Sequence, residues 1–131
     1  MIVRPPFGVS TAEAYGWYDE DRTAGVRENR EFQQLPVPWP SRAAQMINDL
    51  EPPVIRRHQE IAALKVQLRE AGASAAAMSG SGSAVFGLFR SRALAERAVN
   101  PLSRNGAKAL VTRTLTRAEH ERRAKPVRSV K

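Results

Sequence analysis

The chain has 131 residues, 42% of them hydrophobic, which is enough for one compact core but short for two independent domains. It contains no cysteine and only two histidines, so disulfides, zinc–thiolate sites and thiol nucleophiles are excluded, and we expect no metal site. The net charge is +8, and because the sequence shows neither an apolar run that could cross a bilayer nor a signal peptide, we expect a cytoplasmic protein that makes no membrane contact.

The first predicted elements are a short strand and a capped helix. Residues 2–3 are typical of a strand, whose start we expect to lie before Met1. Ser10 and Glu13 have the spacing of a capping box, in which each side chain accepts a hydrogen bond from the other residue's backbone N–H. This box predicts a short helix that ends at about Tyr18.

A long connection and a second, longer helix follow. Residues 19–40 are polar and then proline-rich, which predicts a surface segment, and Ser41 can cap a short helix through residues 46–47. Apolar residues recur at helical spacing over residues 54–71 and predict one continuous amphipathic helix. Gly72 then supplies the left-handed residue that ends many helices.

The last part of the chain alternates strands and a helix. Two apolar runs, residues 73–78 and 84–89, predict strands joined by a glycine-rich loop. Ser91 predicts the start of a helix that ends near Pro101, and residues 109–114 predict a last strand. The order of elements predicts an α+β fold of two layers, with helices packed on one face of a mainly antiparallel sheet.

The glycine-rich loop is the sharpest candidate for chemistry. Gly80 and Gly82 allow a tight turn in which bare N–H groups converge on an anion such as a phosphate. The sequence lacks the Gly-Lys-Ser/Thr ending of a Walker A loop, and a strand follows where a dinucleotide fingerprint would have a helix. On the motif alone, a purely structural hairpin is the better interpretation.

Two further groups of residues allow both a functional and a structural interpretation. Thr11 and Tyr15 can share one face at a helix N-terminus, where an anion binds readily and a base can stack, although a second cap and a core-edge aromatic explain them as well. Asp49 and Glu51 can do acid–base work or hold magnesium, but negative charge at the start of the following helix favours a capping role. His58 fits a boundary position, and no serine has a histidine and acid partner.

The C-terminal residues 116–131 carry half of the net charge. They hold six basic and two acidic residues, and we expect a solvated, disordered tail. We do not expect nucleic acid as a partner; that reading predicts affinity that falls steeply with salt and is lost when the tail is deleted.

Four segments resemble, in order and at matching distances, the C-terminal half of the 4-diphosphocytidyl-2-C-methyl-D-erythritol kinases of the GHMP kinase superfamily. The resemblance covers about residues 2–115. The segments are Val9-Ser10-Thr11-Ala12-Glu13-Ala14-Tyr15, Asn48-Asp49-Leu50-Glu51-Pro52-Pro53-Val54, Met78-Ser79-Gly80-Ser81-Gly82-Ser83-Ala84-Val85-Phe86-Gly87 and Val111-Thr112-Arg113-Thr114-Leu115.

The resemblance implies a ferredoxin-like GHMP kinase C-terminal domain over residues 1–115, with the tail outside it. It implies a kinase that uses ATP and Mg²⁺ to phosphorylate the 2-hydroxyl of the methylerythritol portion of a cytidine diphosphate conjugate. Tyr15 matches the aromatic that lies against the cytosine, Thr11 the adjoining position near the phosphates, and residues 48–51 a signature with a structural role. The family's loop that supports the phosphate-bearing ligands is matched by Ser79, Gly80, Ser81, Gly82 and Ser83.

The departures from the family pattern concern catalysis. The family's catalytic lysine, catalytic aspartate and main ATP loop would lie upstream of Met1 and have no counterpart here. We therefore expect no catalytic residue, no cofactor and no kinase activity in this chain alone, and a missing N-terminal half as its partner at the substrate. The alternative is a stand-alone module of the same fold that binds a nucleotide or another anion. The sequence leaves the oligomeric state open.

Overall fold

Four short strands form one antiparallel sheet in the computed structural model, which describes residues 1–26 and 46–124. The strand order is β2-β3-β1-β4, so β1 pairs with β3 on one side and with β4 on the other. This is the ferredoxin-like arrangement, with β3 inserted between β1 and β2. The predicted α+β class is confirmed. The strands are β1 (Ile2–Arg4), β2 (Ala75–Met78), β3 (Val85–Leu88) and β4 (Lys108–Leu110).

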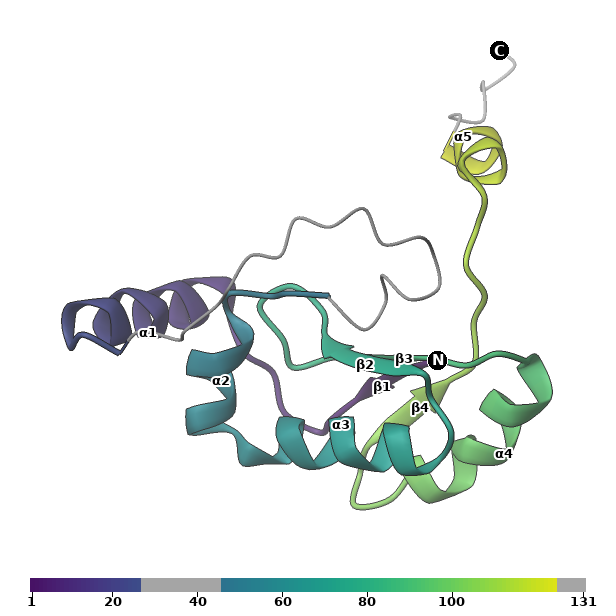
Figure 1. Ribbon diagram of the computed structural model, residues 1–131, viewed down its shortest axis with the longest axis horizontal. Coiled ribbons are helices and arrows are strands. Elements are labelled where there is room, and N and C mark those ends of the chain that lie inside the picture. The colour runs from purple at the N-terminus through teal and green to yellow at the C-terminus, as the bar shows by residue number, and fades with distance from the viewer. Residues whose placement is uncertain (27–45, 125–131) are drawn as a thin grey trace, which may run out of the picture.

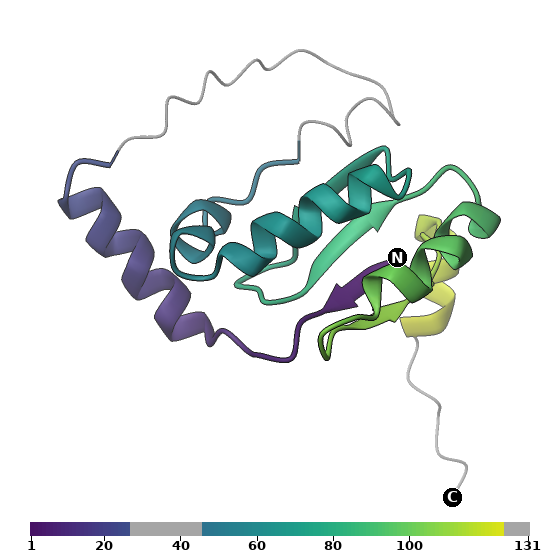
Figure 2. The same cartoon turned by 90° about the horizontal axis from the view of Figure 1, so that it is seen from below.

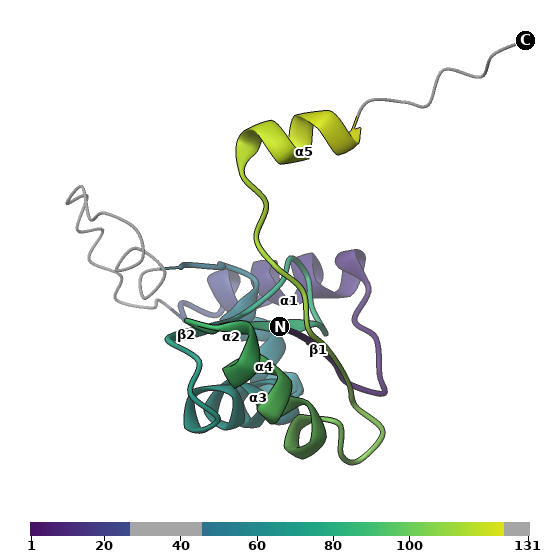
Figure 3. The same cartoon turned by 90° about the vertical axis from the view of Figure 1, so that its right-hand side faces the viewer.

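Of the helices in the described residues, two cover one face of this sheet and three lie elsewhere. In Figure 1, α3 and α4 lie below the strands, α1 and α2 lie at one end, and α5 stands away from the body. Figure 2 shows α3 and α4 from below, and Figure 3 shows the sheet between them and α5. The helices are α1 (Thr11–Thr23), α2 (Glu51–Arg57), α3 (Gln59–Glu70), α4 (Arg92–Leu102) and α5 (Arg117–Ala124).

The core lies between the sheet and the pair α3 and α4. Val3 and Val85 of the sheet are fully buried, as are Ile61 and Leu68 of α3. Gly87 allows this close packing, because a Cβ at that position would lie 2.8 Å from a methyl carbon of Leu68. The glycine therefore sets how closely α3 approaches β3.

The single helix predicted over residues 54–71 is in fact two helices, which corrects that prediction. The chain breaks at His58, whose φ of −134° and ψ of 78° are not helical. The imidazole stacks on Phe7 with 4.7 Å between ring centroids and lies 5.7 Å from the ring of Trp17. The break therefore coincides with contacts to the N-terminal segment. The spacing of apolar residues over 54–71 could not predict these contacts.

Capping residues and glycines in the sequence predicted most helix ends correctly. Gly72 has the expected positive φ of 98°, and the Ser91 side chain caps α4 by accepting from the backbone N–H of Leu94. The end predicted for α1 was wrong, since the helix continues five residues beyond Tyr18 to Thr23. Helix α4 runs through Pro101 to Leu102.

Three other predictions concern the remaining segments. Most of the predicted connection and of the short helix from Ser41 lies outside the described residues, and Met46 and Ile47 belong to no helix. The expectation of a disordered tail is corrected over 117–124, which form α5; Thr116 and Glu119 make a second capping box there. Residues 125–131 lie outside the described part. No described helix is long and apolar enough to cross a membrane.

Candidate functional site

A cleft of about 970 Å³ lies where α1, the segment before α2 and the loop after β2 meet. Its lining is mainly apolar, and hydroxyl, amide and carboxylate side chains are among the lining residues. The structure brings the two separate candidate groups of the sequence, the α1 residues and the glycine-rich loop, into one site. The lining residues are Thr11, Tyr15, Tyr18, Met46, Ile47, Asn48, Asp49, Leu50, Ala77, Met78, Ser79, Gly80, Ser81 and Phe86.

The N-terminal end of α1 forms one wall of the cleft. The capping box of Ser10 and Glu13 is present with both hydrogen bonds, so the start of the helix is fixed where the sequence predicts it. Thr11 lies at the first position after the cap, and its hydroxyl is 3.3 Å from that of Ser81. One turn further, Tyr15 lines the cleft and is 56% exposed, so the residue is accessible to a ligand.

The glycine-rich loop is a closed turn of the backbone. The N–H of Ser79 donates to the carbonyl of Ala84 at 2.8 Å, and the N–H of Gly82 donates to the carbonyl of Ser79 at 3.0 Å. Gly80 has a φ of 57°, which a residue with a side chain rarely adopts. Within the described residues, the N–H groups of Gly80 and Ser81 have no hydrogen-bond partner. They are therefore available donors at the rim of the cleft.

Two residues before and at the start of α2 hold this loop in place. The side-chain amide of Asn48 donates to the carbonyls of Met78 at 3.1 Å and Gly80 at 2.8 Å. The Glu51 carboxylate accepts from the N–H of Met78 at 2.6 Å and also from the Lys65 ammonium. The sequence did not indicate that Asn48 contacts the loop, because the partners are about 30 residues apart and no periodic pattern links them.

Gly82 and Ser83 do not line the cleft, although they belong to the predicted phosphate loop. Ser83 is 5% exposed, and its hydroxyl donates to the carbonyl of Phe7 at 2.5 Å. A Cβ on Gly82 would lie 2.9 Å from the sulfur of Met78. These two residues therefore fasten the loop to the body, while Ser79, Gly80 and Ser81 face the site.

The electrostatics of the cleft are modest. Asp49 is the only charged residue among the described residues that line it. Hydrogen bonds from the Ser10 backbone and side chain lower the pKa of the nearby Glu13 carboxyl, so this cap stays ionised at neutral pH. No three His, Asp or Glu side chains of the described segments lie together as metal ligands would. What the cleft offers is a stacking surface beside a set of neutral hydrogen-bond donors.

The family that matches this chain and the known proteins that resemble it agree with one another. The family described as GHMP kinases C terminal matches residues 33–108. A 4-diphosphocytidyl-2-C-methyl-D-erythritol kinase of Solibacter usitatus is 41% identical over 109 residues, which make up 78% of this chain and 34% of that protein. The kinase of the same name from Pelotomaculum thermopropionicum is 37% identical over 87% of this chain and 40% of its own length.

A solved structure shares the fold as well. The crystal structure of a 4-(cytidine 5'-diphospho)-2C-methyl-D-erythritol kinase matches with a TM-score of 0.53 and 26% identity, over 77% of this chain and 37% of that one. The chain spans only about a third to two fifths of the length of the curated relatives described above.

Proposed function

This chain belongs to the family of GHMP kinase C-terminal domains, and from that premise we propose that it is the substrate-side domain of an ATP-dependent kinase. The reaction is transfer of a phosphoryl group to the 2-hydroxyl of 4-diphosphocytidyl-2-C-methyl-D-erythritol, an isoprenoid precursor, in the cytoplasm. Residues 1–115 form the domain. In this proposal, its partner at the substrate is an N-terminal kinase half, which would account for the greater length of the relatives.

The observation that carries this proposal is the meeting of α1 and the glycine-rich loop in one cleft. Tyr15 offers an exposed ring, and the loop offers the N–H groups of Gly80 and Ser81. The hydroxyls of Thr11 and Ser81 join the two elements across 70 residues of sequence. A base stacked on an aromatic beside donors for a diphosphate is the arrangement that a cytidine diphosphate conjugate requires.

The charges of the residues that line the cleft bear on which part of the enzyme would perform the phosphoryl transfer. Phosphoryl transfer needs positive charge around the transferred group, and no Lys or Arg is among the described residues that line the cleft. We therefore propose that ATP and Mg²⁺ are bound mainly by the other half. In our proposal, Tyr15 orients the base, the loop donors hold phosphate oxygens, and these 131 residues alone do not transfer the phosphoryl group.

Calorimetry with the cytidine conjugate tests the binding site. Stacking of one base is worth about 1–3 kcal/mol, so Tyr15→Ala should weaken binding by about 5- to 150-fold, while Tyr15→Phe should keep most of the affinity. Val66→Ala, at an exposed position on α3 away from the cleft, is the control and should bind normally. Equal affinity of Tyr15→Ala and the unsubstituted chain would overturn the assignment of this site.

Complementation separates the proposal from the alternative, a stand-alone module that binds a nucleotide or another anion. The chain is assayed for phosphoryl transfer alone and with the N-terminal half of a kinase relative supplied as a second polypeptide. We expect transfer only with both parts. A chain that binds the conjugate tightly but never supports transfer would favour the stand-alone module.

A further inference from the structure

Two neighbouring stripes of side chains on helix α1 make different contacts. Thr11, Tyr15 and Tyr18 follow one another at helical spacing and line the cleft. Ala14 and Asp21 lie on the neighbouring stripe, since Tyr18 is four residues after Ala14 and three before Asp21. This second stripe turns toward the body of the protein. Ala14 is fully buried there, whereas the side chain of Asp21 is 16% exposed.

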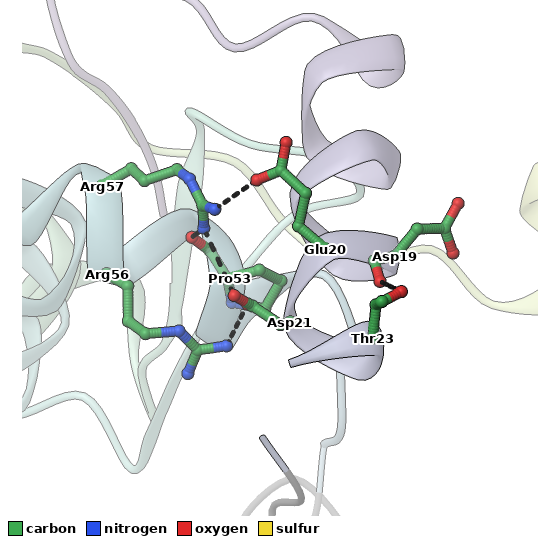
Figure 4. Close-up of polar contacts among 7 residues, drawn as sticks. All are labelled: Asp19, Glu20, Asp21, Thr23, Pro53, Arg56 and Arg57. Carbon is green, nitrogen blue, oxygen red and sulfur yellow. Dashed lines mark hydrogen bonds and ion pairs between the residues drawn. The ribbon is translucent and has the colours of Figure 1, made fainter. Parts of the chain in front are cut away.

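Asp21 is held by two arginines from the end of α2. Figure 4 shows its carboxylate between Arg56 and Arg57, with one oxygen paired to Nη2 of Arg56 and the other 3.7 Å from Nη1 of Arg57. Arg57 is itself fixed, because it donates to the carbonyl of Pro53 at 3.1 Å. Its guanidinium also lies over the ring of Trp17, at 5.1 Å from the centroid.

These contacts matter because α1 has little apolar packing. Ala14 is its only buried residue, and Trp17 packs partly buried against the core beside His58. Beyond Trp17 no side chain of α1 is buried, so polar contacts must fix the direction of the last turns of the helix. The N-terminal end is attached at Thr11 through Ser81. At 1.5 Å per residue, Tyr15 lies about 6 Å along the helix from that attachment and Asp21 about 15 Å. If the far end is released, the contacts of Thr11, Ala14 and Trp17 remain, and the helix can tilt about them, which moves the ring of Tyr15.

We propose that Asp21 is a positioning residue which, through Arg56 and Arg57, sets the direction of α1 and thereby the place of the Tyr15 ring in the cleft. Its role rests on the proposed function, because it matters for a ligand only if Tyr15 contacts one. Asp21 is well shielded, so its ion pairs are screened by water less than exposed pairs are. Glu20 also pairs with Arg57, at 2.7 Å, but its side chain is 66% exposed, and we assign it no such role.

A double-mutant cycle on conjugate binding tests the coupling. Asp21→Asn should weaken binding by about five- to tenfold in the unsubstituted background, but should have no effect in the Tyr15→Ala background, because the loss is transmitted through that ring. Asp21→Glu should restore part of the affinity, and Glu20→Gln should bind normally. A loss that is the same in both backgrounds would mean general destabilisation and would overturn the proposal, as would full affinity in Asp21→Asn.

A second measurement needs no ligand. The chain has no native cysteine, so spin labels can be placed at Asp19→Cys on α1 and at Val66→Cys on α3. We expect one narrow distance distribution, which broadens in Asp21→Asn and stays narrow in Glu20→Gln. An unchanged distribution in Asp21→Asn would rule out the positioning role. If the unsubstituted chain fails to bind the conjugate, the proposed function fails, and the label distances still decide whether Asp21 fixes α1.

Discussion

The carboxylate of Glu51 accepts a hydrogen bond from the backbone N–H of Met78, with 2.6 Å between the two atoms. Because Glu51 begins α2 and Met78 ends β2, this bond joins the helix layer to the strand that leads into the glycine-rich loop. Lys65 of α3 completes the contact as the ion partner of Glu51. The start of α2 has no side-chain cap hydrogen bond, so Glu51 lies in the first turn of the helix but holds the loop where the sequence predicted a cap.

The first prediction concerns this contact. Glu51→Ala should lower the free energy of unfolding by about 1–3 kcal/mol, because the part-buried N–H of Met78 loses its acceptor. Urea denaturation measures the change. Glu70→Ala, an exposed acid at the end of α3, is the control and should shift stability by no more than about 0.5 kcal/mol. Comparable losses in the two variants would contradict the bracing role of Glu51.

Two glycine substitutions should change stability in opposite directions. Gly87→Ala places a methyl group against Leu68 in the core and should cost about 1–3 kcal/mol through overpacking. Gly16→Ala lies inside α1 with nothing within 4 Å of the new Cβ, and should add about 0.5–1 kcal/mol through helix propensity. Thermal unfolding of both variants checks the pair. A stable Gly87→Ala variant would show that α3 can move away from β3.

The start of α5 should depend on pH. The pKa of Glu119 is lowered from 4.5 to about 2, first by the hydrogen bond from Arg113 and then by those from Thr116. A lowered pKa in the folded state means that the cap stabilises α5 fully above pH 4.5 and loses this effect as the pH falls through about 2. Amide shifts of residues 117–120 should follow this transition. Glu119→Gln should abolish it, and a transition unchanged in that variant would refute the assignment.

The sheet face opposite α3 and α4 should promote self-association. Paired positions across the four strands place Ala77, Phe86, Ile2 and Leu110 in one row, and Ile2 and Leu110 are 39% and 63% exposed. An exposed apolar row on a sheet tends to find a partner. Sedimentation should show association that rises with concentration and falls in Leu110→Lys. A sharp monomeric species with a cooperative melt would contradict this.

The resemblance drawn from four sequence segments is confirmed by the family match and by the relatives. The assignment of Thr11, Tyr15 and the loop residues to a ligand stays a prediction. What the structure adds is their common cleft, and it separates Ser79, Gly80 and Ser81, which face it, from Gly82 and Ser83, which do not.

The sequence by itself determined the features that depend on neighbouring residues. The box of Ser10 and Glu13, the cap at Ser91 and the left-handed Gly72 each involve groups within about four positions of one another, so residue type and spacing suffice to predict them.

Three features were decided only by the tertiary structure. They are the helix break at His58, the hydrogen bonds from Asn48 to the loop, and the ion pairs of Asp21 with the two arginines. Each of these joins residues that are 30 or more positions apart in the chain. Such contacts exist only after the helices have packed on the sheet, since packing is what supplies the partner. A pattern of spacing along the chain records which face of a helix is apolar, but not which distant polar group that helix will meet.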